Sequence, residues 1–288
     1  MPEQAVDAVR GLHSYHLLSA GSGAVGPAPR DLFAWCVRGV AQGLVEHGAY
    51  VRVSRQAMRR PAAERQLAPR FAELAALDAN PVAELVGGLR DEAAFRRCWN
   101  GYNRLAPLGV DTQLLPHGGA LRREPQGDAA DSAFRRAAIA ACAAGLRTRA
   151  NDAREATGDE PGAPPRLAAT WRLLGLRGDG VPEAAAALHE TPDADLARTA
   201  ARLGCSARTL QRQLTGAGLH FGLLRQAVRI GLAGRLLRRD PESLTAIAHT
   251  AGFFDSAHFT RAWRQACGIT PSDYRALCRT AHDARAAA

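Results

Sequence analysis

The feature that most constrains the fold is a short pattern of two helices around a glycine, which occurs twice in the last third of the 288-residue chain. In the first copy, Thr191 starts a helix as part of a threonine-proline pair, and Gly204 ends it. Ser206 is a favourable N-cap for the next helix, in which Leu210 and Leu214 share one face. A helix, a glycine turn and a second helix predict a helix-turn-helix unit.

The second copy lies 48 residues further along the chain and repeats the spacing of the first. Gly252 takes the place of the turn glycine, and Phe259 and Trp263 take the inner positions of the second helix. Residues 221–240, between the copies, predict one helix of about 18 residues, which is about 27 Å long. This length can hold the two units nearly one DNA turn apart, about 34 Å, so that two recognition helices enter successive major grooves.

Basic residues are concentrated in the same part of the chain. The sequence contains no lysine, so all 37 basic residues are arginine. From position 191 onward there are 14 arginines and 7 acidic residues, a net charge of +7, whereas the first 190 residues carry a net charge of +2. The preference for arginine over lysine fits the codon bias of a GC-rich genome. The uneven distribution, however, predicts an anionic partner for the C-terminal part.

Residues 193–278 resemble the AraC-type DNA-binding domain, in which one helix joins two helix-turn-helix units. The strongest signature is AGFFDSAHFTRAWRQACGITPSDYR, residues 251–275. The segment SARTLQRQLTGAGLHFGLLRQAVRIGLAGRLL, residues 206–237, resembles a subgroup in which an arabinose-binding-like sensing domain comes first. The segment FRRCWNGYNRLAPLGVDTQLLPHGGALRREP, residues 95–125, resembles that sensing domain. The resemblance implies a sequence-specific transcriptional regulator whose N-terminal domain senses a small effector or mediates dimerisation.

The polar residues left facing outward on the two recognition helices are the candidate DNA contacts. Arginine can bond guanine and glutamine can bond adenine in the major groove. The resemblance implies base contacts at Arg208, Gln211 and Arg212, and the alternative is an ordinary solvated face. Phe259 and Trp263 are expected in the core. The complete candidate set is Arg208, Thr209, Gln211, Arg212, Ser256, Ala257, His258, Thr260 and Arg261.

The fold class is predicted to be mainly α, with a mostly helical α+β sensing domain before the double helix-turn-helix domain. Asp31 is expected to start an amphipathic helix with Leu44 on its inner face and a stop at Gly48. A hairpin is expected around Gly118. The predicted organisation is a flexible arm over 1–29, a sensing or dimerisation domain over 30–180, a linker over 181–190, the AraC-type domain over 191–280 and a disordered tail over 281–288.

Three aromatic residues at helical spacing, Phe95, Trp99 and Tyr102, are candidates for an effector pocket, although such a stripe more often packs in a core. The expected partners are double-stranded operator or promoter DNA, RNA polymerase, a small effector and a second copy of the chain. No metal or cofactor is expected, because the cysteines are scattered and include no C-x-x-C pair. The sequence shows no signal peptide and no membrane-spanning run, so we expect a cytoplasmic location and no membrane partner.

Two other functions stay open at this point. A regulator with this DNA-binding domain could be controlled by protein partners and bind no small molecule. An enzyme fused to the domain is the other alternative, because some relatives carry a cysteine methyl acceptor or an amidotransferase-like domain. Cys36, Cys98 and Cys142 are too dispersed for the former, and no nucleophile elbow, phosphate loop or dinucleotide motif is present. The sequence therefore favours a non-enzymatic regulator and leaves open whether it activates or represses.

Overall fold

The computed structural model of the protein describes residues 11–87, 89, 91–116, 121–125, 132–156, 166–176, 180–239 and 241–286. The elements of the N-terminal half are β1 (His13–Tyr15), α2 (His16–Ser19), a π-helical turn η1 (Ala20–Ala24), α3 (Pro29–Ala41), β2 (Leu44–Glu46), α4 (His47–Met58), a 3₁₀ turn η2 (Ala63–Gln66), α5 (Leu67–Leu77), α6 (Pro81–Gly87), α7 (Glu92–Leu105), β3 (Val110–Leu114) and β4 (Leu121–Pro125). The later elements are α8 (Ala133–Ala156), α9 (Arg166–Leu173), α10 (Val181–Glu190), α11 (Leu196–Arg202), α12 (Ala207–Gly216), α13 (Phe221–Arg239), α14 (Leu244–Thr250), α15 (Ser256–Cys267) and α16 (Pro271–Ala286).

The described residues are mainly helical, which confirms the predicted fold class. Within them, the strands form two small antiparallel sheets, in which β1 pairs with β2 and β3 pairs with β4. The second pair is the expected hairpin. In the part of the chain that is described, no helix is both long and apolar enough to cross a membrane.

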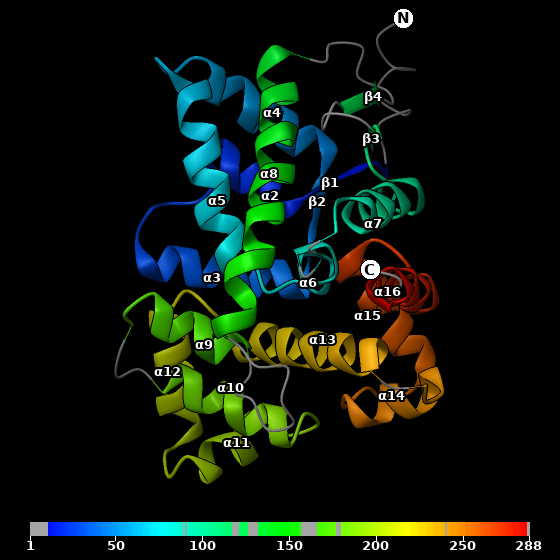
Figure 1. Ribbon diagram of the computed structural model, residues 1–288. Helices are drawn as coiled ribbons and strands as arrows, with labels where there is room; N and C mark the ends of the chain where they lie inside the picture. Colours follow the sequence, from blue (N-terminus) through cyan, green and yellow to red (C-terminus); the bar gives the residue numbers. More distant parts are fainter. Residues whose placement is uncertain are drawn as a thin grey trace, which may run out of the picture.

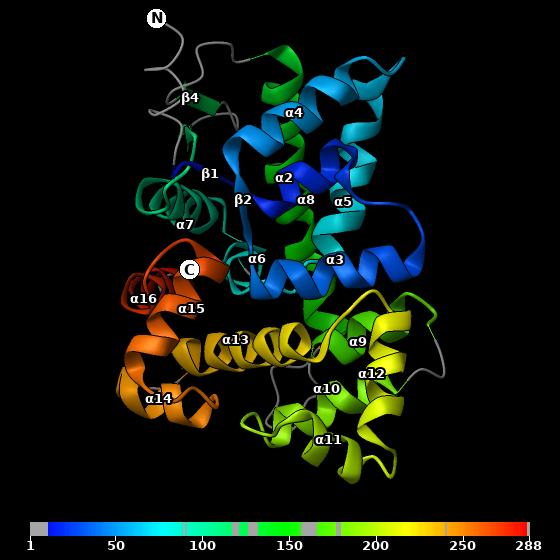
Figure 2. The ribbon, with the colours of Figure 1, turned by 180° about the vertical axis from the view of Figure 1, so that it is seen from behind.

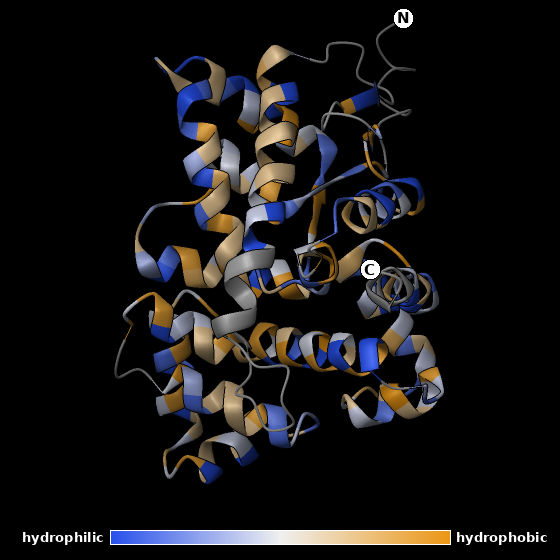
Figure 3. Ribbon diagram, in the orientation of Figure 1, coloured by the Kyte–Doolittle hydropathy of each residue, from blue (hydrophilic) through white to orange (hydrophobic). Residues whose placement is uncertain are grey.

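The N-terminal elements form a helical body on one side of α13, and the two helix-turn-helix units lie toward its two ends (Figure 1). The view from behind shows that α3 runs alongside α13 (Figure 2). α13 carries hydrophobic and hydrophilic residues in alternation along its length (Figure 3). Its apolar residues are buried, which makes it the element on which the body and both units are assembled.

α5 and α8 pack closely and form the centre of the N-terminal body (Figure 1). Gly145 permits this approach, because a Cβ at this position would lie 2.7 Å from the carbonyl oxygen of Phe71. Phe71 and Leu74 on α5 are fully buried, and Cys142 and Leu146 on α8 are nearly so. The small residues of α8 therefore serve close helix packing.

The predicted flexible arm is wrong over residues 11–29, while residues 1–10 lie outside the described part. β1 pairs with β2, and both Tyr15 and Leu17 are buried in the body. The glycine-rich stretch that suggested flexibility packs tightly, because a Cβ at Gly21 would lie 2.3 Å from the Phe71 ring. Glycine is used here for close approach.

Four further boundaries differ from the sequence prediction. α3 ends at Ala41, and Leu44 enters β2 because it pairs with Tyr15 there. Residues 181–190 form helix α10, which packs against α13, in place of a linker. α11 begins at Leu196 because the Asp195 side chain caps it, accepting a hydrogen bond from the backbone N–H of Arg198 at 2.8 Å. The predicted disordered tail is helical through residue 286.

Candidate nucleic-acid interface

The first helix-turn-helix unit consists of α11 and α12. Gly204 forms its turn with a φ of +67°, a left-handed conformation that glycine adopts without steric cost. The Ser206 hydroxyl caps α12 by accepting a hydrogen bond from the backbone N–H of Thr209 at 3.1 Å. Leu210 and Leu214 are completely buried, as predicted. The polar face of α12 is therefore turned away from the core.

The second unit consists of α14 and α15 and repeats this design. Its turn glycine, Gly252, has a φ of +79°. Asp255 caps α15, since its carboxylate accepts a hydrogen bond from the backbone N–H of His258 at 2.6 Å. Phe259 and Trp263 are completely buried, which confirms that they belong to the core. The internal duplication seen in the sequence is thus a structural one.

The C-terminal end of α12 is held against the N-terminal body by two arginines of α3. Arg30 donates a hydrogen bond to the carbonyl oxygen of Gly216 at 3.2 Å, and Arg38 donates to that of Gly218 at 2.9 Å. Both guanidinium groups are on exposed residues. Positive charge at a helix C-terminus also complements the helix dipole. The first unit is therefore attached to the body at its surface.

The C-terminal end of α15 is held by backbone and side-chain donors that are buried. The Ala266 carbonyl oxygen accepts hydrogen bonds from the backbone N–H of Gly43 at 2.9 Å and from Nδ2 of Asn80 at 3.0 Å. Nδ2 of Asn80 also donates to the carbonyl oxygen of Gly39 at 2.7 Å. Asn80 has no solvent exposure. The second unit is therefore attached to the body through its interior.

Both recognition helices consequently place their C-terminal ends toward the body and their N-terminal ends away from it. α12 has 10 residues and α15 has 12, so they project by about 15 Å and 18 Å at 1.5 Å per residue. The N-terminal end of a helix carries partial positive charge and unpaired N–H groups, which attract anions. This arrangement places the two N-terminal helix ends on the side of the molecule that faces away from the body, where the Asp255 carboxylate offsets the positive end of α15.

The predicted contact residues lie on these outward parts of the helices, although none of their base contacts is tested. Four of them are exposed and the others are partly buried. Within the described residues, the side chains of Arg208, Arg212 and Arg261 make no hydrogen bond or ion pair. The exposed residues are Arg208, Arg212, Ala257 and Arg261, and the partly buried ones are Thr209, Gln211, Ser256, His258 and Thr260.

Three predicted contact residues, Thr209, Gln211 and Thr260, already use their side chains inside the helix, and Nε2 of Gln211 donates a hydrogen bond to the Thr215 hydroxyl at 3.5 Å. The Thr260 hydroxyl donates a hydrogen bond to the carbonyl oxygen of Ser256 at 2.8 Å. The Thr209 hydroxyl lies 2.9 Å from that of Ser206. These hydroxyls retain an acceptor site but are fixed in orientation. Arginines without such bonds are freer to adapt to a base edge.

Three arginines of α13 make contacts inside the protein. Nε of Arg229 donates to the carbonyl oxygen of Pro192 at 2.7 Å. Arg225 donates to a carbonyl oxygen of the same loop at 3.4 Å. Arg238 forms an ion pair with Glu84 at 2.8 Å and donates to the Tyr274 hydroxyl at 2.9 Å. Although burial opposes the charge of Arg238, Tyr274 and Glu84 hold its pKa above the ordinary value.

One exposed residue beside the second recognition helix escaped the sequence prediction. Phe254 directly precedes the cap Asp255, and 84% of its surface is exposed, whereas its neighbour Phe253 is buried. A pair of phenylalanines in a tight turn must place one ring inward and the other outward. That pairing was the signal available in the sequence. Its position next to the positive end of α15 adds an apolar group to the candidate interface.

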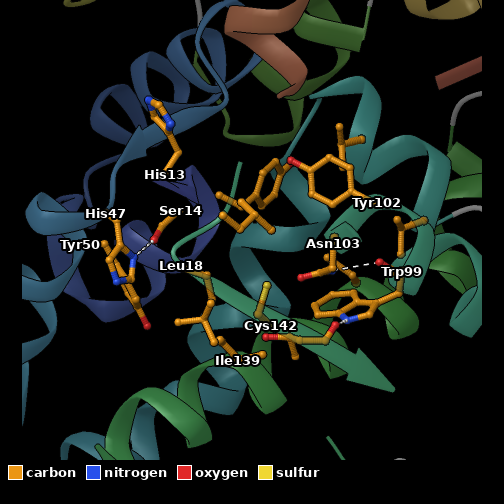
Figure 4. Close-up of a pocket in the computed structure, with 17 residues that line it drawn as sticks. His13, Ser14, Leu18, His47, Tyr50, Trp99, Tyr102, Asn103, Ile139 and Cys142 are labelled. Carbon is orange, nitrogen blue, oxygen red and sulfur yellow. Dashed lines mark hydrogen bonds between the residues drawn. The ribbon is translucent and has the colours of Figure 1, made fainter. Parts of the chain in front are cut away.

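The N-terminal body contains an internal cavity of about 60 Å³, which has room for several water molecules. Trp99 and Tyr102, two of the predicted pocket aromatics, line it (Figure 4). Phe95 is not among the lining residues. It is buried and stacks on Trp99, and the guanidinium of Arg147 lies 5.0 Å from its ring centre. Sequence reasoning missed Tyr50, which comes from α4 and also lines the cavity.

Comparisons with known proteins agree with this geometry in the C-terminal part of the chain. Residues 199–277 match the family described as "Helix-turn-helix domain". HTH-type transcriptional regulator RipA of Corynebacterium glutamicum is 43% identical over 72 residues, which are 25% of this chain and 22% of RipA. The Ornithine utilization regulator of Pseudomonas aeruginosa is 40% identical over 81 residues, 28% of this chain and 24% of that protein.

HTH-type transcriptional activator RhaS of Escherichia fergusonii is 40% identical over 78 residues, 26% of this chain and 27% of RhaS. The matches thus span about a quarter of the length of these curated relatives. No solved structure matches the chain significantly. The relatives are regulators of the AraC family. The C-terminal part of this protein is an AraC-type helix-turn-helix domain.

Proposed function

We propose that the protein is a sequence-specific transcriptional regulator that binds double-stranded DNA through α12 and α15. The observation that carries this proposal is the orientation of the two recognition helices. Their C-terminal ends are bonded to the body, so their capped N-terminal ends and exposed arginines face outward together. α13 has 19 residues and spans about 28 Å between the two units. That span suits two adjacent major grooves on one side of a duplex.

The proposed contacts are divided between reading and positioning. Arg208, Gln211 and Arg212 read bases from α12, while α15 contributes Ala257 and Arg261 to a less specific contact. Ser256, His258 and Thr260 lie at the same end of α15, and Thr209 lies at the N-terminal end of α12. Phosphate contacts make up the larger share of hydrogen bonds in protein–DNA interfaces, so we assign Arg261 to a contact with a DNA phosphate.

The N-terminal body is proposed to sense a small effector. A buried chain of hydrogen bonds leads from the wall of the cavity to the second recognition helix. The Tyr15 hydroxyl donates to Oδ2 of Asp78 at 2.8 Å, and Oδ1 of Asp78 accepts from the backbone N–H of Asn80 at 3.0 Å. Nδ2 of Asn80 reaches the Ala266 carbonyl oxygen on α15. An effector that moves Tyr15 can therefore change how α15 is held, and the coupling would be reciprocal.

Asp78 is the centre of this chain and is completely buried. Burial opposes its ionisation, but His16, whose Nε2 lies 3.1 Å from Oδ2, together with Arg149 and the backbone N–H of Asn80, more than offsets burial and lowers the pKa of Asp78. A carboxylate at this position accepts bonds from three directions. It therefore fixes the relative placement of Tyr15, His16 and Asn80.

The DNA-binding proposal is tested by selecting bound fragments from a genomic DNA library with the purified full-length protein at moderate salt. We expect an enriched motif with two half-sites about one DNA turn apart. A double variant, Arg208→Ala with Arg212→Ala, is expected to lose the motif while retaining its far-ultraviolet circular dichroism. A library without an enriched motif would reject the proposal.

The remaining proposals come from the family resemblance. We propose that the regulator acts in the cytoplasm as a homodimer, with residues 31–150 providing the contact, and that it meets RNA polymerase at the promoter. Sedimentation of the purified protein at micromolar concentration measures the oligomeric state. A monomer at all concentrations, with and without operator DNA, would contradict the dimer.

A further inference from the structure

The cavity in the N-terminal body has a wall chemistry that restricts what it can hold. It is lined by residues from β1, α2, α4, α6, α7, β3 and α8, most of them apolar, including Leu18, Val86 and Ile139. No arginine, aspartate or glutamate is among its lining residues. A charged molecule placed there would lose its hydration and would meet no acidic or basic side chain of the wall other than the imidazoles of His13 and His47. The walls therefore favour a neutral molecule with a largely apolar surface.

Two polar atoms at the cavity wall have no hydrogen-bond partner within the described residues. They are the Tyr102 hydroxyl and Nδ1 of His13, and both atoms are inaccessible to solvent. Tyr102 as a whole is only 5% exposed. Buried polar groups without partners are uncommon in folded proteins, because each costs free energy. A ligand group that accepts or donates one hydrogen bond would satisfy such an atom.

The electrostatic surroundings argue against an anion in particular. The Asp78 carboxylate lies directly behind the wall, where it accepts the bond from Tyr15. Burial first, and Asp78 among the nearby groups, raise the pKa of Tyr102 and of Cys142 well above their ordinary values. Both groups stay neutral, and Tyr102 keeps its proton to donate. Two groups of the wall, Tyr102 on α7 and Cys142 on α8, therefore resist acquiring a negative charge.

A cation is disfavoured for a different reason. Asp78 is the nearest carboxylate, but it already accepts bonds from Tyr15 and Asn80 and pairs with His16. Its oxygens are shielded from the cavity by the Tyr15 ring, which itself lines the wall. An ammonium group in the cavity would therefore find aromatic rings and hydroxyls but no carboxylate.

We infer that this cavity binds a small, neutral, mainly apolar molecule that carries one hydrogen-bonding group, with Tyr102 as its polar anchor. The volume of about 60 Å³ limits the ligand to a few non-hydrogen atoms. Its regulatory consequence rests on the sensing role proposed above, whereas its binding does not depend on DNA. Short alcohols and similar neutral metabolites belong to this chemical class, and their acids and amines do not.

The test uses three probes of nearly equal size and different charge: 1-butanol, butyrate and butylamine. Binding to the full-length protein is measured by saturation-transfer nuclear magnetic resonance and by the shift of the melting temperature. We expect saturable binding of 1-butanol and at least tenfold weaker binding of the other two. Equal binding of butyrate or butylamine, or no saturable binding of 1-butanol, would overturn the inference.

Variants locate the binding site. Ile139→Trp fills the cavity and is expected to abolish binding of 1-butanol. Tyr102→Phe removes only a hydroxyl and is expected to weaken binding roughly two- to tenfold, the value of one hydrogen bond. Tyr274→Phe removes a buried hydroxyl outside the cavity and serves as the matched control, with unchanged affinity. A Tyr102→Phe protein that is folded and binds 1-butanol as tightly as the parent protein would contradict the assignment of Tyr102.

The DNA selection described above keeps the two proposals separate. If a motif is enriched and 1-butanol does not bind, the cavity inference is wrong and the regulator stands. If 1-butanol binds and no motif is enriched, the cavity inference stands and the proposed regulator is wrong.

Discussion

The two helix-turn-helix units have the same local design and different attachments to the rest of the molecule. α12 is fastened by two exposed arginines of α3 that reach the carbonyl oxygens after its last turn. α15 is fastened by Asn80, which has no solvent exposure, and by the backbone of Gly43. Exposed bonds of this type contribute little to stability, whereas breaking a buried one leaves an unsatisfied group.

The cores of the two units also differ, and the second unit again has the more extensive buried contacts. Behind α12 the inner positions are leucines, whereas behind α15 an aromatic series continues from Phe253 through Phe259 and Trp263 to Tyr274. The Tyr274 hydroxyl then donates to the Pro81 carbonyl oxygen in the body. The second unit is thus built into the N-terminal body. The first unit reaches the body through exposed hydrogen bonds and an aliphatic core, without a comparable aromatic series.

The largest expected effect is at the centre of the second unit. Trp263→Ala removes a completely buried ring that packs edge-on against Phe259 and Tyr274, at centroid distances of 5.8 and 5.0 Å. We expect the free energy of unfolding to fall by about 3–5 kcal/mol. Urea denaturation followed by circular dichroism measures it, with Trp263→Phe as the milder control. A loss below about 1 kcal/mol would mean that the unit is not integrated as described.

The attachments themselves can be compared by one substitution each. Asn80→Ala leaves the carbonyl oxygens of Gly39 and Ala266 without this buried donor, and we expect a loss of about 1–3 kcal/mol. Arg38→Ala removes an exposed donor and is expected to cost about 0–1 kcal/mol. Thermal and urea unfolding of both variants decide the point. An equal cost for both would remove the distinction between the two attachments.

The recognition helices are compared by DNA affinity. Arg212→Ala is expected to cost about 1–3 kcal/mol at the selected site and to relax the preference at one base pair. Arg261→Ala is expected to weaken binding to all sequences alike and to reduce the salt dependence by about one counterion. Gel-shift titration at several salt concentrations separates these outcomes. Unchanged affinity of Arg212→Ala would remove it from the set of base readers.

The smallest expected effect concerns the contact between α10 and α13. His189 at the end of α10 accepts a hydrogen bond from Arg235 on α13, and burial, followed by this positive neighbour, lowers the pKa of His189 below 6.5. The unfolded chain therefore takes up this proton before the folded one does. The stabilisation of the folded protein by neutral His189 is therefore complete above pH 6.5 and decreases as the pH falls below that value.

We expect the melting temperature to fall by about 1–3 °C through this window in a way that His189→Gln removes. Calorimetric scans at pH 7.5 and at pH 5.5, for both proteins, measure the difference. An identical pH dependence in the variant would show that another group is responsible.

Local signals in the sequence were enough to predict the C-terminal domain. Glycine at two turn positions, caps before the recognition helices and apolar residues at helical spacing act within a few residues of each other, so they predict their elements without tertiary information. The hairpin of β3 and β4 was predicted for the same reason. The locations of the outward arginines follow from the same periodicity.

The N-terminal part was harder to predict because its structure depends on contacts between distant residues. The stretch around Gly21 resembles a flexible arm in composition, and only the ring of Phe71, 50 residues later, shows that it is packed. Leu44 fits the inner face of a helix by periodicity, but pairing with Tyr15 places it in a strand. The cavity combines residues from seven elements, and no local pattern connects them.

The sequence by itself determined that this chain ends in two helix-turn-helix units joined by a helix and that their outer faces carry arginine. Those properties follow from caps, glycines and periodicity along short segments. The tertiary structure alone decided how each unit is held, which arginines of α13 are internal, and that Tyr102 rather than Phe95 faces a cavity. Such contacts join residues far apart in the chain, for example 193 positions in the bond from Tyr274 to Pro81, and burial at that range is fixed only when the whole chain has packed.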